Sequence, residues 1–219
     1  MTNDKKNYSD FTNFIIRDDH PCVMAQSVFE LDHVDLHTYT GFGSKTAAVA
    51  ILEDLKVYIA NYDFDSNDFY TFLAIFEDEG DRNEQQFEDN LWQQLGHLHE
   101  ADDQEWDKQV SQDPKDEGFS FSLAGRAFYI VGLHTNSSRR ARQAPHTAMA
   151  FNLHWQFERL REMGTYKRVR DTIRRRDRKL QGGINPMLAD YGTHSEARQY
   201  SGRQIDPSWE CPFSHQKGS

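Results

Sequence analysis

The sequence predicts an α+β fold in which a central, mostly antiparallel sheet is flanked by helices. Amphipathic helix patterns and short runs of β-forming residues both occur along the chain. They do not follow the strict strand-helix-strand alternation that would favour a doubly wound parallel sheet. Two of the strand-like runs are also joined by a tight turn, which is typical of an antiparallel hairpin.

Length and composition favour one domain spanning residues 1–219, with residues 1–18 as a polar N-terminal segment. A chain of this length can bury a sizeable core without disulfides or a structural metal. The aromatic content of 13% is too high for a disordered chain. No apolar run approaches the roughly 20 residues that span a bilayer, and the start lacks the apolar core of a signal peptide. We therefore expect a cytoplasmic protein with reduced cysteines and no membrane partner.

The first half of the chain contains two clear helix patterns around one strand pattern. Apolar residues recur at spacings of three and four in Ser44–Tyr62, which predicts a helix with Ser44 as its N-cap. The aromatic and aliphatic run 69–76 predicts a buried strand. A second helix is expected from about Asn83, followed by an acidic surface loop over 100–117.

Strand patterns dominate the middle of the chain. Residues 119–123 and 126–134 are rich in β-forming side chains and are separated by Ala124-Gly125, which predicts a hairpin. Residues 148–151 predict a further short strand. Leu153, Phe157 and Leu160 then mark a helix that ends near Gly164.

A basic helix is expected from Tyr166 to Leu180, ended by Gly182-Gly183 and Pro186. It carries eight Lys and Arg residues against two Asp residues, although the whole chain has a net charge of −10. Three interpretations stay open: a solvated or internally ion-paired face, a clamp for an anionic ligand, or a nucleic-acid contact through Arg174, Arg175 and Arg176. The acidic remainder argues against nucleic acid as a partner.

Several residues have the chemistry of metal or catalytic sites. His33, Asp35 and His37 supply the ligand types of a non-heme iron oxygenase, but an extended strand holds its i and i+4 residues roughly 13 Å apart. His154 lies beside the apolar stripe of its helix and can point into an apolar cavity. Cys211-Pro212, next to aromatic residues, can supply thiolate to heme iron, although a small buried thiol is the commoner outcome. The chain contains no phosphate-binding glycine loop, GxSxG or HExxH motif.

The C-terminal motifs together resemble the YqcI/YcgG family over residues 145–213, and Pro21-Cys22 fits that family loosely. The residues that carry the resemblance are Phe151-Asn152-x-His154-x-Gln156-Phe157-Glu158-x-Leu160-Arg161, Arg168-x-x-Asp171, Leu180-Gln181-Gly182-x-Ile184-Asn185-Pro186-Met187-Leu188, Ser195-Glu196-Ala197-Arg198-Gln199-Tyr200-Ser201-Gly202-Arg203 and Trp209-x-Cys211-Pro212-Phe213. Members of the family include heme-dependent N-oxygenases, among them a guanidine N-hydroxylase and, more distantly, an arginine N-hydroxylase. The resemblance implies a heme enzyme that uses O₂ to hydroxylate an amine or guanidine nitrogen of a small cationic or amino-acid-like substrate.

The resemblance also suggests roles for individual residues. His154 is the first candidate for the axial metal ligand, Cys211 the second and His146 the third. Glu196 and Arg198 are the catalytic candidates, with Glu196 suited to hold a cationic substrate by charge pairing. The candidate partners of the two heme propionates are Arg139, Arg140, Arg168, Arg175, Arg198 and Arg203. A separate electron donor is expected because the chain has no room for a reductase domain, and a homodimer is compatible with the sequence.

Two alternatives from other functional classes accompany this hypothesis. One is an iron oxygenase without heme that uses His33, Asp35 and His37. The other is a non-enzymatic module that binds anions or nucleic acid through the arginine-rich helix.

Overall fold

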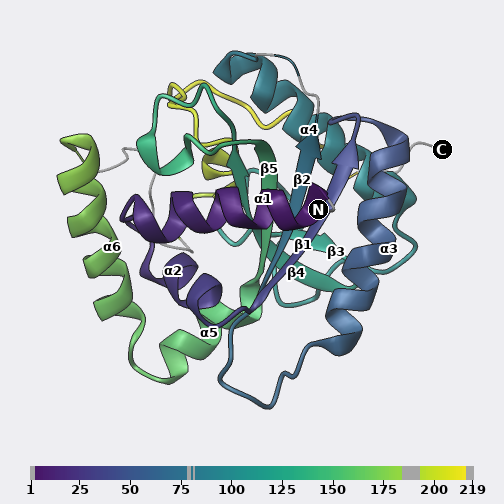
Figure 1. Cartoon of the computed structure of the whole chain (residues 1–219). Helices are drawn as coiled ribbons and strands as arrows, with labels where there is room; N and C mark the ends of the chain where they lie inside the picture. The colour runs from purple at the N-terminus through teal and green to yellow at the C-terminus, as the bar shows by residue number, and fades with distance from the viewer. Residues whose placement is uncertain (1–2, 78–79, 81, 184–192, 216–219) are drawn as a thin grey trace.

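A computed structural model describes residues 3–77, 80, 82–183 and 193–215, and their centre is a five-stranded sheet with the order β1-β2-β5-β4-β3 (Figure 1). The strands are β1 (Val34–Thr40), β2 (Thr71–Glu77), β3 (Phe121–Leu123), β4 (Arg126–Leu133) and β5 (Thr147–Leu153). β1 and β2 are parallel, while the other neighbouring pairs are antiparallel. This confirms the predicted α+β fold with a mostly antiparallel sheet.

One face of the sheet is covered by the two helices that the periodicity predicted. α3 (Lys45–Asn61) is capped by the Ser44 side chain, and α4 (Glu84–Ala101) is capped by Asn83 in a capping box with Gln86. Their apolar sides meet alternate residues of the strands in a largely aromatic core. We refer to this side as the packed face.

Gly132 shows how closely α4 approaches the packed face. A Cβ atom at this position of β4 would lie 2.6 Å from Leu91 Cδ1 and 2.8 Å from Phe87 Cε1. Such contacts are far inside normal van der Waals separation, so only glycine fits beneath these two side chains.

The opposite face carries the remaining helices, and we call it the cavity face. α1 (Asn3–Thr12) crosses the sheet, and α6 (Tyr166–Gln181) lies at the edge of the molecule (Figure 1). Between them along the chain come a π-helical turn, η1 (Asn13–Arg17), α2 (Val23–Glu30) and α5 (His154–Glu162). Two short 3₁₀ helices, η2 (Arg140–Arg142) and η3 (Glu196–Gln199), complete this side.

The N-terminal segment differs from its expected form, because residues 3–17 are helical and packed against the sheet. Phe11 and Ile15 are buried in the apolar cluster of the cavity face. Asn7 is also buried, and its amide donates hydrogen bonds to Thr38 and Glu77. The sequence did not predict this helix because its composition is polar, and only a few of its side chains reach the core.

Most of the other predicted elements are confirmed. The hairpin of β3 and β4 turns through Ala124 and Gly125, whose φ angles of 49° and 72° suit a tight type I′ connection. Residues 102–118 contain neither helix nor strand, as expected for the acidic loop. The Ile184 to Leu188 motif, including the stop at Pro186, lies outside the described residues. None of the helices in the described ranges has the length and apolar content needed to cross a bilayer.

Candidate functional site

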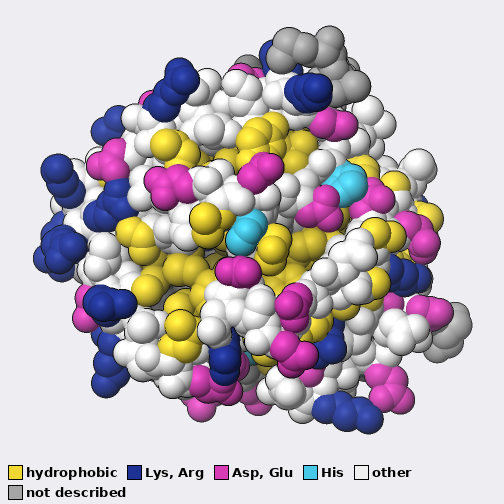
Figure 2. Space-filling model, turned by 60° about the horizontal axis from the view of Figure 1, so that its bottom comes forward, with side chains coloured by type: hydrophobic (Ala, Val, Ile, Leu, Met, Phe, Trp, Pro, Cys, Tyr) yellow, Lys and Arg dark blue, Asp and Glu magenta, His cyan; other side chains and the backbone are white. Residues whose placement is uncertain are grey.

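A cavity of about 310 Å³ lies between the cavity face of the sheet and the helices that cover it. This volume falls at the lower end of the ~300–1,000 Å³ typical of small-molecule sites. Its lining is mainly apolar and includes residues from both ends of the chain, from Phe11 to Gln199. On the face shown in Figure 2, hydrophobic side chains gather around a central depression, with Lys and Arg along the edge where α6 lies.

Strand alternation determines which side chains reach this cavity. Successive residues of a strand point to opposite faces, so Ile130 faces the packed side while Tyr129 and Val131 line the cavity. On β5, Ala150 and Asn152 line it for the same reason. His154 continues that alternation beyond the end of β5 and also lines the cavity as the first residue of α5.

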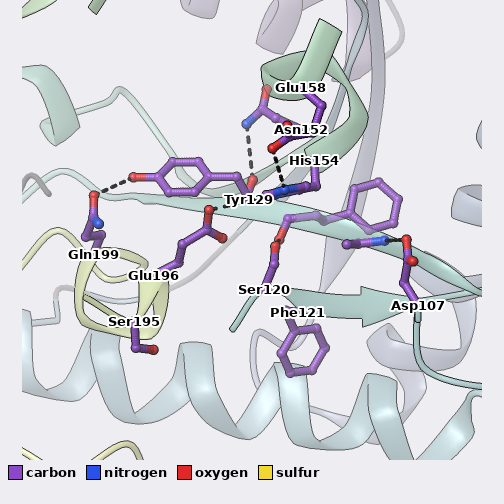
Figure 3. A network of polar contacts seen from close by, with 12 residues as sticks. Asp107, Ser120, Phe121, Tyr129, Asn152, His154, Glu158, Ser195, Glu196 and Gln199 are labelled. Atoms are coloured by element: carbon purple, nitrogen blue, oxygen red, sulfur yellow. Dashed lines mark hydrogen bonds and ion pairs between the residues drawn. The ribbon is translucent and has the colours of Figure 1, made fainter. Parts of the chain in front are cut away.

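His154 is a buried imidazole held between two carboxyl groups (Figure 3). Its Nε2 lies 3.3 Å from Glu158 Oε1, one helical turn later, and its Nδ1 lies 3.9 Å from Glu196 Oε1. Burial lowers the pKa of His154, and this effect outweighs the opposing attraction of Glu158. The imidazole is therefore neutral at physiological pH, the state that binds a metal.

Glu196 is the buried carboxyl on the other side of His154 (Figure 3). Burial raises its pKa to about 8, although hydrogen bonds from Ser120 and Tyr200 oppose the shift. The Tyr200 hydroxyl donates to Glu196 Oε2 at 3.3 Å. Glu196 is thus mostly protonated at neutral pH and can donate a proton, whereas Glu158 has no comparable burial.

Arginine side chains form much of the polar lining of the cavity. Arg139 donates to the buried Asp177 of α6 at 2.6 Å, and Arg161 pairs with Glu158. The other arginines that line the cavity are Arg142, Arg170 and Arg174. The cavity thus combines apolar walls, a neutral histidine, a protonated carboxyl and several cations.

The matches to known proteins cover the residues on both sides of this cavity. The sequence model of the YqcI/YcgG family matches residues 11–214. The chain belongs to this family. It is also similar to the uncharacterized protein YcgG of Bacillus subtilis (strain 168), with 24% identity over 216 residues that cover 91% of this chain and 83% of YcgG. No solved structure matches it.

The match to the YqcI/YcgG family also covers the residues that form the N-terminal wall of the cavity. In this region the sequence motifs had offered only a loose fit, at Pro21-Cys22. His20 Nε2 lies 2.9 Å from the carbonyl oxygen of Ala141, and burial lowers the pKa of this histidine to about 4. Cys22 is the N-cap of α2, where its Sγ accepts a hydrogen bond from the Ala25 amide. Both residues line the cavity. Pro21-Cys22 was the signal that could have identified them.

The other candidate axial ligands lie outside the cavity lining among the described residues. Cys211 packs beside the aromatic core of the packed face, and burial raises the pKa of its thiol to about 12, which disfavours a thiolate. His146 Nε2 lies 3.0 Å from Oδ2 of Asp10 on α1. Of the three candidates, the structure brings only His154 together with Glu196 at the cavity.

The arginines proposed as propionate partners are dispersed. Arg203 pairs with the buried Glu88 at 2.8 Å, and Arg198 donates to the carbonyl oxygens of Asp206 and Trp209. Arg168 and Arg175 are exposed on α6, and Arg140 donates to the carbonyl oxygen of Leu180. Only Arg139 of the predicted propionate partners lines the cavity, while Arg142, Arg161, Arg170 and Arg174 were not singled out for this role.

Of the residues proposed for a non-heme iron site, His33 has other partners, while His37 contacts Asp35. His33 Nδ1 lies 3.2 Å from the carbonyl oxygen of Phe69, and its ring stacks on Tyr70. His37 contacts Asp35 at 2.9 Å and Asp54 at 3.6 Å. Within the described ranges, no group of three or more His, Cys, Asp or Glu residues is arranged to hold a metal ion.

Proposed function

We propose that this chain is a heme-dependent N-oxygenase that uses O₂ to hydroxylate an amine or guanidine nitrogen of a small amino-acid-like substrate. The observation that carries the proposal is the neutral, buried imidazole of His154 at the wall of a largely apolar cavity. The family resemblance of the C-terminal motifs supports the same reaction class.

The residues around the cavity fit a heme group chemically. An imidazole serves as the axial ligand in many heme proteins, apolar walls suit the macrocycle, and arginines suit its carboxylates. Arg139, Arg142, Arg170 and Arg174 provide such cations around the cavity. When bound, heme supplies the redox chemistry that activates O₂, and electrons come from a separate donor.

His154 has the features needed to bind the iron. Glu158 is positioned to accept a hydrogen bond from Nε2–H, and in that tautomer Nδ1 would be the nitrogen that binds a metal. A carboxylate partner of this kind fixes the tautomer and orients the ring. The pairing of Glu158 with Arg161 in turn orients that carboxylate.

Glu196 would act as a proton donor beside the reacting centre, because burial keeps its carboxyl protonated near neutral pH. This changes the role expected from the motifs, in which Glu196 held a cationic substrate by its negative charge. Tyr129 lies along the same wall, and its hydroxyl donates to Gln199 Oε1 at 3.0 Å. These groups would orient a polar substrate while the apolar lining excludes water.

The test is the absorption spectrum of protein produced with a heme precursor, in ferric, ferrous and ferrous-CO forms. The wild-type protein should show a Soret band that is lost or shifted in His154→Ala. His146→Ala and Cys211→Ala serve as matched controls and should retain the wild-type spectrum. A folded wild-type protein that shows no Soret band in any form overturns the proposal.

A further inference from the structure

Arg142 is a cavity-lining arginine whose guanidinium is held by neutral carbonyl groups among the residues that the structure describes. Its guanidinium donates to the carbonyl oxygens of Gly132 at 2.9 Å, of Tyr200 at 3.3 Å and of Gln199 at 3.3 Å. No carboxylate of the described residues lies within ion-pair distance of it. The nearby Asp177 is already bound by Arg139.

A cation in such a place is costly without an anionic partner. Burial is the main cause that lowers the pKa of Arg142, and the neighbouring Arg139 adds to the effect, while Tyr129, Cys22 and Asp177 oppose it. Arginine nevertheless stays protonated in proteins, so the charge persists. Removing a charge from water without a counter-ion is strongly unfavourable. The cavity therefore contains an excess positive charge at this point.

The surroundings hold the guanidinium in a fixed position. Three carbonyl oxygens fix two of its nitrogens. The backbone of η2 is also bound to the residue that follows β4, because the His134 amide donates to the Arg142 carbonyl at 3.0 Å. Gly202, at a φ of +79°, lies against the side chain so closely that a Cβ would approach Arg142 Cγ to 3.0 Å. Arg142 is thus preorganised beside the cavity that it lines.

We propose that Arg142 is the anchor for a carboxylate group of the ligand that occupies the cavity. Bidentate pairing with a carboxylate suits the guanidinium fork and would neutralise the buried charge. Two sources share this chemistry: a propionate of heme, or the carboxylate of an amino-acid substrate. The first source rests on the proposed function, whereas the second does not require heme.

The experiment titrates the full-length apoprotein with two matched pairs of ligands. In the dimethyl ester of hemin both propionate charges are removed by methylation, and agmatine is L-arginine without its carboxylate. The variants are Arg142→Met and, as a control with the same change of charge, Arg178→Met, an exposed residue of α6 outside the cavity lining. Arg142→Lys provides a second test that keeps the charge but removes the planar fork.

The carboxylate form of at least one pair should bind the wild-type protein roughly 10- to 100-fold more tightly, as expected for hydrogen bonds to a charged group. Arg142→Met should abolish that difference, Arg142→Lys should reduce it, and Arg178→Met should preserve it. If Arg142→Met loses the difference in affinity between hemin and its ester, Arg142 binds a heme propionate. If it loses the difference between L-arginine and agmatine, Arg142 binds the substrate carboxylate. If the carboxylate gives no gain in either pair, or if the gain survives in Arg142→Met, the proposal is wrong. A failure of hemin alone would instead count against the heme function.

Discussion

The two faces of the sheet are formed by the same strands but differ in how closely the helices pack against them. On the packed face, α3 and α4 press aromatic and aliphatic side chains onto the strands so closely that Gly132 must lack a side chain. On the cavity face, α1, α2, α5 and α6 leave about 310 Å³ unfilled, and the walls carry His154, Glu196 and several arginines. Dense packing stabilises the fold, whereas the incomplete packing opposite provides room for a ligand.

The largest change in stability is expected from substitutions at two adjacent residues of β4 that point to opposite faces. Ile130→Ala removes a fully buried side chain from the packed face and should lower the free energy of unfolding by about 2–5 kcal/mol. Val131→Ala only enlarges the existing cavity and should cost less than about 1 kcal/mol. Urea denaturation of both variants measures the difference. Equal losses would mean that the two faces are packed alike.

The cavity face should also make stability depend on pH through Glu196. Its pKa of about 8 in the folded protein exceeds the ordinary value of 4.5, so the folded state binds the proton more tightly than the unfolded state. Stability should therefore fall between pH 4.5 and 8 by about 1.4 kcal/mol per pH unit relative to Glu196→Gln. Denaturation of both proteins across this range tests the expectation. Parallel curves would show that Glu196 is not protonated in the folded protein.

The smallest change in stability is expected from variants of two helix caps, one on each face of the sheet. Ser44→Ala removes the hydroxyl that accepts from the Ala47 amide at the start of α3, and should cost about 1 kcal/mol. Cys22→Ala removes a sulfur that accepts from the Ala25 amide at 3.4 Å, and should cost less because sulfur is a weak acceptor. Thermal unfolding can rank the two variants. A larger loss in Cys22→Ala would indicate that the thiol has a structural role beyond capping.

The same contrast explains how far the sequence could predict the structure. α3, α4 and the β3–β4 hairpin were predictable because each has a strong local signal: regular apolar spacing, a capping residue or a tight turn. α1 and α2 lacked such a signal because few of their side chains enter a continuous core. Their role as a wall of the cavity depends on contacts between residues far apart in the chain, such as Phe11 and His146.

The candidate site was predictable only in part for a similar reason. His154 and Glu196 stand within recognisable motifs, and the structure brings them to within 3.9 Å across about forty residues of sequence. Arg142 belongs to none of the quoted motifs, and its importance appears only when its neighbours are known. Arg203, although within a motif, is engaged by Glu88 on α4.

In the proposed function His154 binds heme iron from the wall of the cavity, and a His154→Gly variant is the sharpest test of that role. This variant should bind hemin more weakly than the wild-type protein and lack its Soret spectrum. Added imidazole should fill the space left by the side chain and restore that spectrum, whereas His146→Gly should need no such rescue. If His154→Gly retains the wild-type spectrum without imidazole, the iron is bound by another residue and the account of this site is wrong.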